Sequence, residues 1–173
     1  MRLLPVAVVF FAASHGFAQT PAVAVSLKSL RFLTGIWTPD ERERDSQTME
    51  FHWENRQGRA VLVSRTWTGD EKGCPWCVTQ AMMLAYYDDA SNQAHIAFIN
   101  KSRRTIVFTL ASAAQKSVEF LTMEERGIPT YRLTYKLSSA NQLLITLEKA
   151  TPVGSYFPVA QWSLHRRSPF LFP

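Results

Sequence analysis

Residues 131–148 read YRLTYKLSSANQLLITLE and contain two runs in which apolar and polar side chains alternate. The first run, residues 131–137, has an aromatic residue or a leucine at every second position, and the second run, residues 143–147, has leucine or isoleucine there. Alternation with a period of two is typical of a strand that buries one face. The residues between the runs, SSAN at 138–141, are of types that favour turns. This stretch therefore predicts an antiparallel β-hairpin.

The same period of two continues through most of the chain, and turn-type clusters separate the runs. The runs lie at residues 48–54, 61–67, 78–87, 94–98, 106–110, 118–120, 131–137, 143–147 and 160–164. Short strands joined by turns, without helices between them, predict an antiparallel sandwich or barrel. The links are mostly short, which favours a meander, and closing a meander removes its exposed edges. We therefore predict an all-β fold, an up-and-down barrel of about eight to ten strands, over a sandwich.

One short helix precedes the strands. In the segment SLKSLRFLT, residues 26–34, the apolar side chains are spaced by three and four positions, and Ser26 is a suitable N-terminal cap. Gly35 follows, where the helix is expected to end. Neither an internal repeat nor a low-complexity linker is visible, so residues 19–173 are predicted to form one domain.

The first 18 residues have the features of a signal peptide. A charged start at Met1-Arg2 leads into an apolar run over residues 3–13, and Gly16-Phe17-Ala18 provides small residues at a cleavage site. The run is shorter than the roughly 20 residues that span a bilayer, and no later run approaches that length. We predict a signal peptide at 1–18 and a periplasmic or secreted mature chain without an integral membrane segment.

The charge pattern argues against a nucleic-acid partner. The formal net charge of +5 comes from lysines and arginines that lie in separate segments, several of them with acidic residues between. A nucleic-acid-binding surface needs basic residues clustered with aromatic ones. These charges are better suited to solvating loops, and the sequence predicts no oligomeric state.

Cys74-Pro75-Trp76-Cys77 contains both cysteines of the chain. A structural disulfide in a loop between two strands is predicted, since export would place the pair in an oxidising compartment. A C-x-x-C redox site and two free thiols are the alternatives, although no βαβ pattern surrounds the motif. Structural zinc needs four ligands, so no metal site is expected here.

Five motifs resemble the calycin superfamily, specifically exported bacterial lipocalin-like domains of uncharacterised function and, more distantly, nitrobindin-like barrels. The stretch LRFLTGIW at residues 30–37 is similar to the helix and G-x-W strand that open those barrels. The other similar stretches are MEFHW at 49–53, YRLTY at 131–135, QLLITLE at 142–148 and WSLHRR at 162–167. The resemblance covers almost all of the mature chain.

This resemblance implies a barrel of eight to ten strands that holds a small hydrophobic ligand inside. It also implies that Trp37, after Gly35, closes one end, with Arg166 from the last strand over its ring. Nitrobindin-like barrels bind haem through a histidine on a late strand, whereas His165 is the histidine in this region and abuts the end of the motif. We therefore expect no haem and no other cofactor.

The middle strands suggest candidate ligand contacts. Because alternate residues of a strand point to opposite faces, the inward set is either Met82, Leu84 and Tyr86 or Met83, Ala85 and Tyr87. We predict the first set, which continues from Val78 and is bulkier. With Phe98 and Tyr135 it forms the predicted ligand-binding group, although packed core is the alternative for all of these residues.

No catalytic motif is present, and the chain is not predicted to be an enzyme. Glu50 and His52 share a strand face opposite Phe51, so we expect them to face solvent. His52, His95 and His165 lie on different strands, without metal-ligand spacing. Three functions stay open: a ligand-binding barrel, an enzyme with a lipocalin-like cavity, and a filled barrel that binds a partner through its surface. Arg65, Arg132 and His95 are the ionisable groups that an enzymatic cavity would use.

Overall fold

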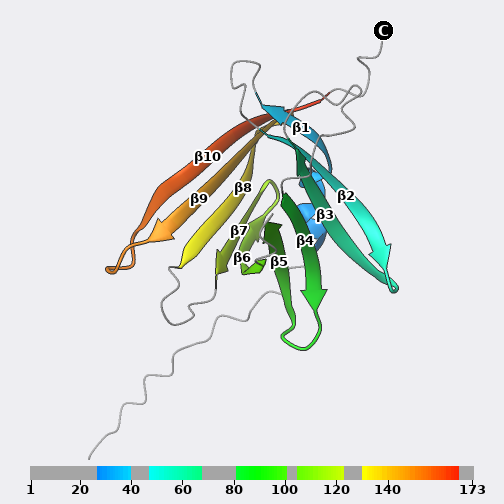
Figure 1. The fold of residues 1–173 in the computed structure, drawn as a ribbon, viewed down its shortest axis with the longest axis horizontal. Coiled ribbons are helices and arrows are strands. Elements are labelled where there is room, and N and C mark those ends of the chain that lie inside the picture. The colour runs from blue at the N-terminus through cyan, green and yellow to red at the C-terminus, as the bar shows by residue number, and fades with distance from the viewer. Residues whose placement is uncertain (1–26, 40–46, 68–80, 101–104, 123–129, 168–173) are drawn as a thin grey trace, which may run out of the picture.

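The computed structural model describes residues 27–39, 47–67, 81–100, 105–122 and 130–167. These residues form a closed barrel of ten antiparallel strands, preceded by one short helix (Figure 1). The elements are η1 (Leu27–Leu33), β1 (Gly35–Pro39), β2 (Thr48–Arg56), β3 (Arg59–Trp67), β4 (Ala81–Asp88), β5 (Gln93–Asn100), β6 (Thr105–Ala114), β7 (Ser117–Thr122), β8 (Tyr131–Ser139), β9 (Gln142–Ala150) and β10 (Tyr156–Arg166). The prediction of an all-β up-and-down barrel is confirmed.

The strands follow one another around the barrel in sequence order, and β10 returns to pair with β1. In Figure 1 these two strands, red and blue, lie side by side at the top of the view. Trp37 is the register partner of Arg166 across this seam, and of Met49 on β2. In this closed antiparallel meander each described strand pairs with two neighbours, so none of them is an edge strand.

The predicted N-terminal helix is present as a short 3-10 helix, η1. Its apolar spacing buries Leu30 and Leu33 completely, and the helix lies against β4. The indole Nε1 of Trp37 donates a hydrogen bond to the Leu33 carbonyl oxygen at 2.6 Å. That carbonyl lies in the last turn of η1, where helical backbone acceptors lack partners within the helix, so the Trp37 indole caps η1.

The inward face of β3 differs from what its hydrophobicity suggests. Ser64 and Thr66 face the barrel interior together with Leu62, whereas Val61 and Val63 are on the outer face. Val63 is nevertheless fully buried. Because the outer residues Val61, Val63 and Trp67 are buried as well, apolar character alone does not identify the inner face.

On β4 the predicted inward set was the wrong one. Met83 and Ala85 are buried in the core, and Met83 pairs in register with the inward residues Ser64 on β3 and Phe98 on β5. Met82, Leu84 and Tyr86 therefore lie on the outer face. The cause is the same as on β3: the outer surface of these strands is apolar enough that residue bulk gives no guide to direction.

The interior divides into two parts. The part nearer the tight turns at 57–58, 89–92, 115–116 and 140–141 is packed solid, and we call it the closed half. Its packed side chains include nine that are at most 1% exposed: Leu30, Leu33, Trp37, Leu62, Ile96, Val118, Phe120, Leu143 and Leu164. The part towards the opposite strand ends contains a cavity, and we call it the hollow half.

Two predictions lie outside the described residues: the signal peptide at 1–18 and the Cys74–Cys77 disulfide. In the described ranges, no helix has the length and apolar character that crossing a bilayer requires.

A candidate ligand cavity

The hollow half encloses a cavity of about 280 Å³. Side chains from seven strands and from the residue before β2 form its wall: Gln47, Met49, Phe51, Ser64, Thr66, Phe98, Ile106, Phe108, Leu133, Tyr135, Ile145, Leu147 and Trp162. Most of these side chains are apolar or aromatic. Ligand sites typically measure about 300–1,000 Å³ and have apolar walls with a few placed polar groups, so this cavity suits a small ligand.

The exposure of the wall residues decreases from the rim of the cavity to its floor. Ile106 is 47% exposed and forms the outer rim, whereas Tyr135 is only 3% exposed and lies at the floor. Phe98 and Trp162 are half-buried between these levels and pack against the core. The gradient indicates that the cavity is entered from the Ile106 end.

Aromatic rings fix the floor. Tyr135 makes edge-to-face contacts with Phe51 and Phe120, with ring centroids 6.1 and 6.4 Å apart. Such contacts add about 0.5–1.5 kcal/mol to the burial of each pair. Because Phe120 belongs to the closed half and Phe51 to the cavity wall, Tyr135 joins the two halves.

The polar atoms in the wall are few. Ser64 and Thr66 are 3% and 8% exposed and follow one another on the inward face of β3. The Tyr135 hydroxyl donates a hydrogen bond to the Met83 sulfur at 3.4 Å. Burial raises the pKa of the Tyr135 hydroxyl well above its ordinary value, so the group remains a neutral donor.

Two of the five predicted ligand-contact residues line this cavity. Phe98 and Tyr135 are in its wall, whereas Met82, Leu84 and Tyr86 lie on the other face of β4 and do not line it. Sequence reasoning missed Ser64 and Thr66, because hydroxyl residues in a strand suggest a solvent-facing position. Their flanking residues Val63 and Trp67 were the available signal, since they indicate a strand buried on both faces.

The predicted closure residues come together at the seam. The Arg166 guanidinium carbon lies 4.3 Å from the ring centroid of Trp37. Its two terminal nitrogens donate hydrogen bonds to the backbone oxygens of Thr34 at 2.6 Å and Phe32 at 3.0 Å. This combines cation–π attraction with the planar donor geometry that lysine lacks.

Gly35 makes that approach possible. Its φ is +126°, a conformation that side chains disfavour, and a Cβ there would lie 2.9 Å from an Arg166 terminal nitrogen. The glycine is therefore required both by its own backbone and by the arginine beside it.

The ionisable groups that an enzymatic cavity would use are on the outer face of the barrel. Arg65 is exposed, and Arg132 forms a two-pronged ion pair with Glu148, with nitrogen–oxygen distances of 2.7 and 3.0 Å. His95 is 8% exposed but also points outward, since its neighbours Ala94 and Ile96 face the core. None of the three lines the cavity described above.

His95 takes part in a chain of hydrogen bonds with Ser91 and Asp88, three residue types that also form hydrolase triads. Here the order is different: the Ser91 hydroxyl donates to the Asp88 carboxylate at 2.6 Å and lies 3.1 Å from His95 Nε2. A serine whose proton is held by a carboxylate cannot donate it to histidine, as a nucleophile must. Thr109 lies 3.1 Å from the other ring nitrogen, so the chain tethers the β4–β5 turn to β6.

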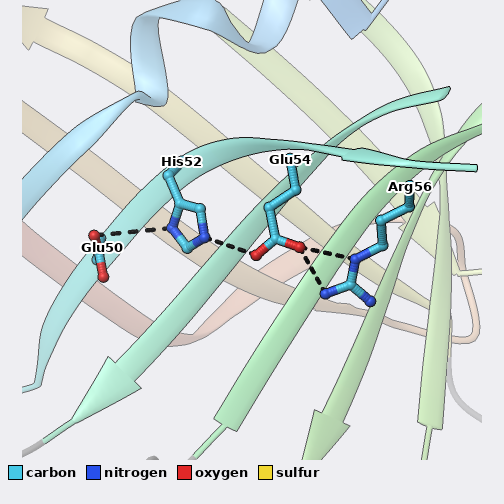
Figure 2. Close-up of polar contacts among 4 residues, drawn as sticks. All are labelled: Glu50, His52, Glu54 and Arg56. Carbon is cyan, nitrogen blue, oxygen red and sulfur yellow. Dashed lines mark hydrogen bonds and ion pairs between the residues drawn. The ribbon is translucent and has the colours of Figure 1, made fainter. Parts of the chain in front are cut away.

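A second polar chain runs along the outer face of β2, where Figure 2 shows Glu50, His52, Glu54 and Arg56 in a row. His52 Nε2 lies 2.9 Å from Glu54, whose other carboxylate oxygen is 2.8 Å from Arg56 Nε. These hydrogen bonds, from His52 first and then Arg56, lower the pKa of Glu54. The side chains are about one-third to one-half exposed, which confirms that Glu50 and His52 face outward. Exposed ion pairs of this kind contribute little stability.

Within the described ranges, no group of three or more histidine, cysteine, aspartate or glutamate side chains is arranged to hold a metal ion. Neither a protein-family model nor a curated protein sequence matches the chain. The resemblance to calycins consequently stays a prediction.

Proposed function

We propose that this protein binds a small, mostly apolar molecule inside its barrel. The observation that carries the proposal is the cavity of about 280 Å³ in the hollow half, walled mainly by aromatic and aliphatic side chains. A ligand that replaces water there gains roughly 25 cal/mol for each Å² of apolar surface removed from solvent. The cavity borders the tightly packed closed half, which holds its floor in place, so the site is largely preformed.

The proposal includes export and a lipocalin-like ancestry. The charged start, apolar run and small residues at 16–18 support a signal peptide, which would deliver the barrel to the periplasm or the exterior. The contact of Arg166 with Trp37 and the hydrogen bond from Trp37 to η1 support the calycin interpretation, since the G-x-W resemblance implies this pairing.

Filling the cavity tests the proposal directly. Ile106 and Val107 are neighbours on β6 with similar exposure, 47% and 41%, but only Ile106 lines the cavity. We expect Ile106→Trp to weaken binding of the neutral fluorescent probe N-phenyl-naphthylamine by about tenfold or more, equivalent to about 1.4 kcal/mol. Val107→Trp, the matched control, should bind as the wild type does.

A second variant is needed because the tryptophan introduced at position 106, on the rim, could point out of the cavity. Leu147→Trp adds the same bulk on β9, at a half-buried wall position. Unchanged probe affinity in both Ile106→Trp and Leu147→Trp would rule the cavity out as the binding site. Native mass spectrometry of protein from its own source would then show whether a co-purifying molecule is held elsewhere.

A further inference from the structure

The cavity has hydroxyl groups on one side and no charge. Ser64 and Thr66 are inward-facing on β3, and Met83, the register partner of Ser64, accepts the hydrogen bond from Tyr135. The Tyr135 hydroxyl is thereby directed to the β3–β4 side of the cavity, where Ser64 also lies. This side offers hydrogen-bond donors, whereas the remaining wall is almost entirely apolar.

The present partner of Tyr135 is a weak one. A thioether sulfur is a poor acceptor compared with an oxygen atom. A ligand carbonyl oxygen that reached the same hydroxyl would replace a weak hydrogen bond by a stronger one. Ser64 is the register partner of Met83, so it offers a second hydroxyl on the same side of the cavity.

A carboxylate has no counter-charge in this wall. All the described residues that line the cavity are uncharged. The inward-facing Arg166 is held by Trp37 and by the Thr34 and Phe32 carbonyls in the closed half. Burying an ionised carboxylate without a paired charge costs several kcal/mol or more.

We propose that the cavity selects uncharged apolar molecules with one carbonyl oxygen, such as ketones, esters or lactones, and that Tyr135 and Ser64 bind this oxygen. This inference rests on the proposed function and specifies its ligand class. It predicts discrimination against a carboxylate of equal chain length.

Three ten-carbon probes separate the possibilities: methyl octyl ketone, decane and decanoate, each used to displace N-phenyl-naphthylamine at neutral pH. We expect the ketone to bind at least about tenfold more tightly than decanoate, because the ionised carboxylate must be desolvated. Decane, which has no oxygen atom, serves as the control for the donor variants described below. If decanoate equals the ketone, the inference is wrong while the proposed function stands. If none of the three displaces the probe, both fail.

Two variants identify the donors. Tyr135→Phe and Ser64→Ala should each weaken ketone binding by about two- to tenfold, the effect of one neutral hydrogen bond, and leave decane binding unchanged. Tyr131→Phe on the same strand and Ser112→Ala on exposed β6 are matched controls that do not line the cavity. Unchanged ketone affinity in both Tyr135→Phe and Ser64→Ala would overturn the assignment of these donors.

Discussion

The closed and hollow halves are built from the same strands, yet their inward side chains differ in kind. On β3 the inward-facing residue of the closed half is Leu62, whereas those of the hollow half are Ser64 and Thr66. The closed half also receives Trp37, which no residue of the hollow half matches in burial. Trp37, on the five-residue strand β1, and the residues of η1 complete the packing of this half. The comparison indicates that stability and binding are separable along the barrel axis.

Substitution of Trp37, which plugs the closed half, is expected to have the largest effect on stability. Trp37→Ala should lower the free energy of unfolding by about 3–5 kcal/mol, from lost burial and the cavity left behind. This is a large share of a total of about 5–15 kcal/mol. Trp162→Ala, in the half-buried wall of the cavity, should cost less than half as much and weaken apolar-probe binding more. Urea unfolding and probe titration measure both, and equal midpoints for the two variants would break the comparison.

Substitution of Arg166, which lies over the Trp37 ring, is expected to have the second-largest effect on stability. Arg166→Met keeps the apolar stem but removes the donors to the Phe32 and Thr34 oxygens. We expect a loss of about 1.5–3 kcal/mol in urea unfolding, the range for hydrogen bonds that involve a charged group. Arg166→Lys retains the charge without the planar fork, so it should recover only part of that loss. Full recovery by lysine would mean that charge alone, and not donor geometry, supports the closed half.

A wall substitution sharpens the other side of the comparison. Phe98→Ala should cost about 1–2 kcal/mol, because the ring is only half-buried, and should change probe affinity severalfold. Met82→Ala, on the outer face of neighbouring β4, should leave affinity unchanged. If Met82→Ala weakens binding as much as Phe98→Ala does, ligand is bound outside the barrel.

The smallest effect concerns the β4–β5 turn. Hydrogen bonds from the Ser91 hydroxyl, and then from the Ala90 and Ser91 backbone amides, lower the pKa of Asp88. A carboxyl whose folded-state pKa is lowered stabilises the protein above its ordinary pKa, and this contribution is lost as pH falls through the folded value. Asp88→Asn should therefore lower the urea midpoint at neutral pH and match the wild type in strong acid.

Asp89→Asn in the same turn is the control for Asp88. Asp89 pairs with Arg59 at 2.6 Å, but both side chains are 66% exposed, so its substitution should have little effect. A wild-type-like midpoint for Asp88→Asn at every pH would show that the turn does not depend on this carboxylate.

The sequence was sufficient for the fold because period-two alternation and turn residues both act locally. It was also sufficient for the contact of Arg166 with Trp37, through resemblance. It failed on β4, where Met82 and Met83 are equally apolar and only the three-dimensional packing distinguishes the faces. Irregular pairing adds to this difficulty, since the register shifts between Leu110 and Ser112 and between Pro158 and Ala160. Such β-bulges reverse the alternation without a reliable sequence signal.

The seam between β1 and β10 has a consequence for how the barrel is assembled. Every other neighbouring pair joins strands that are consecutive in the chain, so those pairings close far shorter stretches of chain. Arg166 and the Thr34 oxygen that it binds are 132 positions apart, so their contact must overcome the entropy of closing almost the entire domain. Until β10 pairs with β1, the strands form an open sheet with two unpaired edges. We expect its apolar inner face to be accessible to other chains as well as to ligand until Arg166 docks on Trp37.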